Sequence, residues 1–210
     1  MSYDALLFDL DGTLIDTETV ALTTGMAAFA AMGHPVDRSF MQRLVGVDLP
    51  TAAGIIGAAL PTLDQKGLQD RWHHAFSAAI DRDLPLKPGA LHLLQARHCP
   101  MALVTSSGEA EAHHKLRVTG LRQHFATVVT LADVTRPKPS PEPYLLAAER
   151  LGVSPARCLV FEDSETGAEA AHRAGCTVVQ VPDVGPVTGR WSHHLASDLL
   201  QGARMAGLTA

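Results

Sequence analysis

Two aspartates, Asp9 and Asp11, stand two positions apart near the start of the chain. They follow the apolar run 5–8, which predicts a buried strand. Side chains two positions apart on a strand point to the same side, so both carboxylates are expected just beyond its carboxyl end. Neighbouring carboxylates repel, which favours a shared proton or a bound cation, and Mg²⁺ suits oxygen ligands together with a substrate phosphate. The ordinary alternative is an Asp-Gly turn with two solvated acids.

Further polar residues follow later apolar runs. Thr105 and Ser106 offer hydroxyl and N–H groups at a helix start, where an anion can bind. Glu162 and Asp163 add two more carboxylates, and Lys138 lies between prolines that restrict the backbone presenting its ammonium group. Each alone has a plain explanation, such as a helix cap or a solvated loop. Their common place at strand ends favours a single site.

The elements that would position these residues alternate between strands and helices. Continuous apolar runs predict buried parallel strands over 5–8, 101–104, 127–129, 158–161 and 177–181. Helical spacing is found over 89–98, 109–119, 143–151 and 168–174, and the tail 191–205 is expected to form one more helix. This alternation predicts an α/β fold with a doubly wound, mainly parallel, Rossmann-like sheet.

One connection is far too long for a crossover helix, because residues 9–100 separate the first two predicted strands. Helical spacing within it covers 17–32, 50–60 and 63–81. We therefore expect an inserted α-helical subdomain at 16–86, with residues 1–15 and 87–210 forming the core. Its two adjacent linkers would allow it to swing as a lid.

Composition excludes several classes of protein. The net charge of −5, without blocks of like charge, argues against a nucleic-acid binder. No apolar stretch reaches the ~18 residues of a membrane span, and neither a phosphate loop of the Walker type nor a dinucleotide fingerprint is present. We expect a cytoplasmic protein with neither nucleic acid nor membrane as a partner. We expect a monomer, because the insertion already covers the site.

Taken together, the four groups of polar residues resemble the motifs of the haloacid dehalogenase-like superfamily. The segment 9–13 resembles its first motif, Thr105 the second, Lys138 the third and 162–164 the fourth. The insertion resembles the family's helical cap of the first type. The resemblance covers nearly the whole chain and is strongest to the branch of β-phosphoglucomutase and small phosphatases.

The resemblance implies a Mg²⁺-dependent phosphatase that works through an aspartyl-phosphate. Asp9 would be the nucleophile and Asp11 the general acid and base. Mg²⁺ would be bound by Asp9, the main-chain carbonyl of Asp11, and Asp163. Glu162 would orient Lys138 or a metal-bound water. The residues expected to bind the transferred phosphoryl group are Leu10, Thr105, Ser106 (through its N–H) and Lys138.

The substrate is expected to be a small phosphorylated metabolite, such as a sugar phosphate, a sugar-alcohol phosphate or phosphoglycolate. Related caps present a specificity loop at the position of Gly46, Val47 and Asp48, and Thr17 and Glu18 lie at the first linker. Each of these five residues has an ordinary alternative role in a helix cap or a solvated turn.

Two other functions compete with this one. A hexose-phosphate mutase of the β-phosphoglucomutase type needs a histidine and an arginine in the cap, at positions occupied here by Ala21 and Leu49. A receiver-like signalling or binding module also combines acids, Mg²⁺ and a lysine. Its phospho-acceptor, however, follows a later strand, and it has no cap. A dehalogenase would lack Asp11. Phosphatase is therefore the preferred reading.

Overall fold

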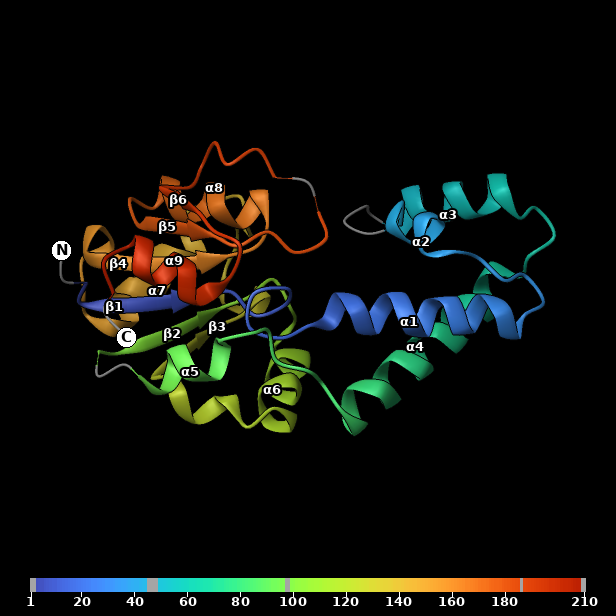
Figure 1. The fold of residues 1–210 in the computed structure, drawn as a ribbon, viewed down its shortest axis with the longest axis horizontal. Coiled ribbons are helices and arrows are strands. Elements are labelled where there is room, and N and C mark those ends of the chain that lie inside the picture. Colours follow the sequence, from blue (N-terminus) through green and yellow to red (C-terminus); the bar gives the residue numbers. More distant parts are fainter. Residues whose placement is uncertain (1–2, 45–48, 97–98, 186, 209–210) are drawn as a thin grey trace. The chain divides into compact units, whose positions relative to one another are not determined.

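The computed structural model describes residues 3–44, 49–96, 99–185 and 187–208 (Figure 1). The chain divides into two compact units, one made of Met1–Asp16 with Pro85–Ala210 and the other of Thr17–Leu84. None of the described helices is long and apolar enough to pass through a membrane.

The first unit is built on a parallel sheet of six strands in the order β3-β2-β1-β4-β5-β6. The strands are β1 (Ala5–Phe8), β2 (Met101–Val104), β3 (Thr127–Val129), β4 (Cys158–Glu162), β5 (Thr177–Gln180) and β6 (His194–Leu195). The chain leaves β1 toward β2 and β3, and later returns to the other side of β1 with β4. Ligands of such sheets bind at the carboxyl ends of the strands where this reversal occurs. The doubly wound α/β fold is therefore confirmed.

Helices cover both faces of this sheet. They are α5 (Ala90–Gln95), α6 (Glu109–Val118), α7 (Glu142–Leu151), α8 (Glu165–Arg173) and α9 (Leu199–Met205), with 3₁₀ turns at Leu121–His124, Leu131–Asp133 and Pro155–Arg157. Helix α7 contacts β1, β2 and β3, and α8 contacts β4 and β5. All four residues of β1 are fully buried, which explains why this strand is continuously apolar rather than alternating.

The alternation of side chains along β1 and β4 decides where their last residues point. Ala5 and Leu7 pack in the same apolar cluster as Tyr144 of α7, and so do Cys158 and Val160 of β4. Because successive side chains on a strand alternate between faces, the next positions with the same direction are residues 9 and 162. Both are carboxylic acids, so the two strands deliver Asp9 and Glu162 to one face at the end of the sheet.

Within its described residues, the second unit contains four helices with their own apolar core. They are α1 (Thr17–Ala31), α2 (Arg38–Gln42), α3 (Leu49–Ala59) and α4 (Gln65–Arg82). Helix α1 packs along α4, where the indole of Trp72 donates a hydrogen bond to the carbonyl of Ala21 at 3.1 Å. A Cβ at Gly25 would lie 2.7 Å from the Trp72 ring, so the small residue permits this close packing.

The tail of the chain differs from the expected helix over 191–205. Residues 194–195 form β6, and only α9 at the end is helical. The backbone N–H groups of His193 and Ala196 donate to the carbonyls of Val178 and Gln180 on β5. Since an exposed sheet edge leaves such groups unpaired, pairing with β5 overrides the helical spacing of this segment, and the expectation was wrong there.

Leu10 provides a test of how tightly the end of β1 is packed. Its side chain is fully buried, so Leu10→Ala is expected to lower the free energy of unfolding by about 2–5 kcal/mol. Leu145→Ala, at an exposed position on α7, should change it by less than ~0.5 kcal/mol. Urea unfolding measures both, and equal effects would contradict the burial of Leu10.

Candidate active site

A buried ammonium group lies at the carboxyl ends of β1 and β4. Lys138 Nζ donates to Asp9 Oδ1 at 2.7 Å, to Glu162 Oε1 at 2.6 Å and to the carbonyl of Val104 at 2.9 Å. A lysine ammonium has three protons, and each has an acceptor here. Burial alone would lower the pKa of Lys138, but the carboxylates of Asp9 and Glu162 outweigh burial and raise it. The side chain therefore stays charged.

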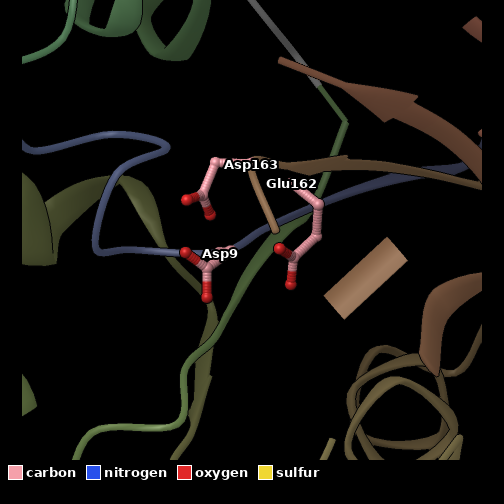
Figure 2. Close-up of side chains that lie close together, drawn as sticks. All are labelled: Asp9, Glu162 and Asp163. Atoms are coloured by element: carbon pink, nitrogen blue, oxygen red, sulfur yellow. The ribbon is translucent and has the colours of Figure 1, made fainter. Parts of the chain in front are cut away.

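Three carboxylates lie close together at this site, those of Asp9, Glu162 and Asp163, as Figure 2 shows. One carboxylate oxygen of each lies within 4.8 Å of those of the other two. Burial, with Glu162 nearby, raises the pKa of Asp9 to about 7 despite the opposing effect of Lys138. Burial, with Asp9 and Glu162 nearby, raises the pKa of Asp163 to about 9. A bound cation would favour the ionised form of these acids, and this set of oxygen donors, two buried and one half-buried, fits a hard divalent cation such as Mg²⁺.

The turn after β1 keeps Asp163 close to this cluster. Thr13 Oγ1 donates to Asp163 Oδ1 at 3.2 Å. Gly12 has a φ of +81°, and a Cβ at that position would lie only 2.5 Å from Asp163 Oδ2. Glycine is required here for two reasons. It permits the left-handed backbone, and its lack of a side chain leaves space for the carboxylate of Asp163.

Glu162 is fixed by residues on two helices. The hydroxyl of Tyr144, a fully buried residue of α7, donates to Glu162 Oε1 at 2.5 Å. Ser164 Oγ, at the start of α8, donates to Glu162 Oε2 at 3.1 Å. The Lys138 ammonium also lies 5.3 Å from the centre of the Tyr144 ring, within the range of a cation–π interaction. Tyr144 was not among the site residues predicted from the sequence, although a buried tyrosine hydroxyl usually requires a hydrogen-bond partner.

The side chain of Asp11 has different partners from that of Asp9. Asp11 Oδ1 accepts a hydrogen bond from Lys115 Nζ at 2.7 Å, and Oδ2 accepts one from Ser107 Oγ at 2.9 Å. Neither Lys115 nor Ser107 was among the expected site residues. One signal in the sequence was available, because Lys115 lies three residues after the buried Ala112 and next to the buried Leu116, on the core-facing stripe of its helix.

The remaining core candidates lie beside these groups. Thr105 is buried after β2, and its Oγ1 accepts a hydrogen bond from the N–H of Ser107 at 3.0 Å. Ser106 is exposed in the same turn, and Leu10 is buried between the two aspartates. The structure thus brings Asp9, Lys138, Glu162 and Asp163 together, and it places the other core candidates at neighbouring positions of the first unit.

The expected cap residues belong to the second unit or lie outside the described residues. Thr17 and Glu18 are the first two residues of α1. Gly46, Val47 and Asp48 fall outside the part of the chain that the structure describes. A role in binding substrate stays a prediction for all five.

The fold and the site together define a class of protein. A carboxylate follows the central strand of a doubly wound sheet, a buried lysine holds it, and acids from the adjacent strand lie within reach of one shared cation. Such an arrangement suits enzymes that transfer phosphoryl or related groups to an aspartate.

Comparison with known proteins identifies the family. The profile of haloacid dehalogenase-like hydrolases matches residues 6–181. The chain is 34% identical to the phosphorylated carbohydrates phosphatase of Thermotoga maritima, over 82% of each protein, and 35% identical to the fructose-1-phosphate phosphatase YqaB of Escherichia coli, over 85% of this chain and 96% of that protein. The crystal structure of a candidate β-phosphoglucomutase from Thermotoga maritima superimposes with a TM-score of 0.83 and 29% identity, over the full length of both chains.

The chain belongs to the haloacid dehalogenase-like hydrolase family. It is a phosphoric monoester hydrolase of that family, in the branch of small phosphatases. The resemblance of the chain to this superfamily is confirmed.

The acid cluster predicts how stability depends on pH and metal. The pKa of Asp163 is about 9 in the folded protein and ~4 in an unfolded chain, so between these values the folded state holds a proton that the unfolded state releases. The melting temperature in EDTA should therefore fall as pH rises from about 6 to about 9. Mg²⁺ should reduce that fall by stabilising the ionised acids.

Scanning calorimetry of wild type and Asp163→Asn, with EDTA and with saturating Mg²⁺, tests this. The variant has no acid at position 163, so its melting temperature should fall less between these pH values and respond less to Mg²⁺. Identical pH and Mg²⁺ responses in both proteins would show that Asp163 is not part of a cation site.

Gly167 provides a second test of the site. A Cβ at this position of α8 would overlap the carboxylate of Glu162. Gly167→Ala is therefore expected to displace Glu162 from Lys138, to lower the free energy of unfolding by about 1–3 kcal/mol and to reduce turnover. In the control, Gly54→Ala, the new Cβ meets no atom within 4 Å. Unchanged turnover in Gly167→Ala would contradict a role for the Glu162–Lys138 contact.

Proposed function

We propose that this hydrolase is a Mg²⁺-dependent phosphatase that cleaves a small phosphomonoester through an aspartyl-phosphate on Asp9. The observation that carries the proposal is the environment of Asp9, which is buried at the end of the central strand and bound to Lys138 at 2.7 Å. Asp163 and Glu162 lie close enough to share a cation with it.

In the first step, a carboxylate oxygen of Asp9 bonds to phosphorus and the bond to the ester oxygen breaks. Asp11 gives a proton to the departing alkoxide, which leaves as an alcohol. In the second step, water attacks the phosphorus of the aspartyl-phosphate while Asp11 takes a proton from it. Inorganic phosphate leaves and Asp9 is restored. Division into two displacements makes each step easier, and a well-placed acid and base contributes ~10²–10⁴-fold.

The other core residues would hold the reacting groups. Asp9, the main-chain carbonyl of Asp11, and Asp163 would bind Mg²⁺, which supplies positive charge against the nucleophile and the phosphate. The transferred phosphoryl group would be held by the backbone at Leu10 and Ser106, the hydroxyl of Thr105 and the ammonium of Lys138. Charges fixed in advance cost no reorganisation during the reaction, and the three hydrogen bonds of Lys138 hold its positive charge beside Asp9.

The relatives support a phosphorylated sugar or sugar alcohol as the substrate. The proteins that are 34% and 35% identical are named as phosphatases of phosphorylated carbohydrates and of fructose 1-phosphate. Their activities support, for this chain, a compact hydroxylated ester, with phosphoglycolate as a smaller alternative. The proposed cap residues, Thr17, Glu18 and 46–48, would contact the part of the substrate away from the phosphate.

A mutase is the second candidate, since the structural neighbour with a TM-score of 0.83 carries that name. A mutase must protect its aspartyl-phosphate from water and bind a second phosphate group. At the cap positions that would supply a histidine and an arginine for this, the chain has Ala21 and Leu49. Neither side chain can bind a phosphate or transfer a proton, which favours the phosphatase.

The deciding experiment is phosphate release from a panel of phosphomonoesters, with Mg²⁺ and with EDTA. The panel contains fructose 1-phosphate, β-glucose 1-phosphate, glycerol phosphate and phosphoglycolate. We expect metal-dependent release that falls to background in Asp9→Asn. Asp4→Asn is the matched control, because Asp4 lies at the opposite end of β1 and pairs with Arg157 on the surface.

Two results would contradict the phosphatase. Release retained by Asp9→Asn would exclude the covalent mechanism. If wild type releases no phosphate, β-glucose 1-phosphate with a trace of the 1,6-bisphosphate should be tested next, and formation of glucose 6-phosphate would establish the mutase instead.

A further inference from the structure

Lys115 is a buried lysine of α6 for which the proposed mechanism gives no role. Only 3% of the residue is exposed, and its helix neighbours Ala112 and Leu116 are fully buried. Lysines are almost never buried to this degree unless their charge is paired. The chain has only four lysines, and the two most deeply buried, Lys115 and Lys138, each contact one of the two aspartates of the first motif.

All three protons of the Lys115 ammonium have acceptors. Nζ donates to Asp11 Oδ1 at 2.7 Å and to Ser107 Oγ at 3.2 Å, and it pairs with Glu111 Oε1 at 2.5 Å. Burial alone would lower the pKa of Lys115, but the carboxylates of Asp11 and Glu111 outweigh burial and raise it. These three contacts hold the ammonium group of Lys115 against Asp11.

Asp11 is held at both of its carboxylate oxygens. Lys115 binds Oδ1, and Ser107, which accepts a hydrogen bond from Lys115, donates its own to Oδ2 at 2.9 Å. Two bonds to different oxygens fix the rotation of the carboxylate as well as its position. A proton donor is effective only when it is aimed at the reacting atom, and small displacements are costly.

We propose that Lys115, acting together with Ser107, is a positioning residue that holds Asp11 in the orientation needed for proton transfer. The inference rests on the proposed function, because it assumes that Asp11 is the acid and base of the reaction. Lys115 would act through Asp11 and would not touch the substrate. Replacement of Lys115 should therefore slow hydrolysis most for esters whose leaving group needs a proton from Asp11.

The first test compares two esters in wild type and Lys115→Met. One is the best alkyl phosphate of the panel, whose alkoxide needs a proton to leave. The other is 4-nitrophenyl phosphate, whose phenolate leaves without one. In the variant, kcat/KM for the alkyl ester should fall about 10- to 100-fold, which is part of the ~10²–10⁴-fold that an acid supplies. For the nitrophenyl ester it should fall much less.

Two further variants control this comparison. Lys115→Arg keeps the charge and should recover part of the lost kcat/KM. Arg117→Met removes an exposed cation from the same helix and should change neither ester. Melting temperatures identify any variant that fails to fold. Equal losses for both esters in folded Lys115→Met would show a merely structural lysine and overturn the proposal.

A double-mutant cycle tests whether Lys115 acts through Asp11. Adding Lys115→Met to Asp11→Asn should cause no further loss with the alkyl ester, because the group to be positioned is already missing. A further loss as large as that in the wild-type background would mean that the two residues act independently, which would also overturn the proposal.

The contact itself can be tested without activity. NMR of ¹⁵N-labelled lysine ammonium groups should show a Lys115 signal that disappears in Lys115→Arg and shifts in Asp11→Asn but not in Asp4→Asn. If Asp11→Asn leaves this signal unchanged, the proposal is wrong whether or not any ester is hydrolysed. If the signal shifts but wild type hydrolyses no ester, the proposed function is wrong. The contact between Lys115 and Asp11 then exists but has no catalytic role.

Discussion

The ammonium group of Lys138 lies between Asp9 and Glu162, and much of the first unit serves to keep it there. Burial makes ionised carboxylates costly, and the adjacent ammonium group offsets that cost. The alternation of β1 and β4 brings the acids to one face. Hydrogen bonds from Tyr144 and Ser164 then fix the carboxylate of Glu162. Gly167 has no side chain and so leaves the space that this carboxylate occupies when it binds the lysine.

The two aspartates of the first motif are chemically identical and two residues apart, but the fold gives them different surroundings. Asp9 is buried and faces Lys138 and the acids of β4, whereas Asp11 lies past the end of the strand, beside α6 and Lys115. Enzymes commonly obtain two roles from two similar carboxyl groups by such a difference in environment. Here the difference arises because the side chain of Asp9 continues the alternation along β1. Directly after Asp11, the turn at Gly12 directs the chain away from the sheet.

Much of this could be predicted from the sequence, because it depends on local pattern. Apolar runs marked five strands, and the candidate acids and hydroxyls of the site followed directly after three of them. Lys115 and Tyr144 were missed because a helical lysine or tyrosine looks ordinary until the partner brought by the fold is known. The segment 191–198 was wrongly predicted to be helical for a related reason, because its hydrogen bonds to the edge of β5 outweigh its helical spacing. The placement of Thr17 and Glu18 relative to the site depends on the arrangement of two units, which no local pattern encodes.

The strand order also has a consequence for how the protein is made. β1 is the first strand to be synthesised, but its partners are β2, which begins at Met101, and β4, which begins at Cys158. At translation rates of about 5–20 residues per second, β1 waits roughly 5–20 seconds for the first partner and longer for the second. The second unit, whose contacts are local, can form during that interval. The growing chain therefore carries an unpaired apolar strand during the interval in which the second unit can fold. Apolar strands that are exposed in this way are prone to aggregation until their partner strands are made.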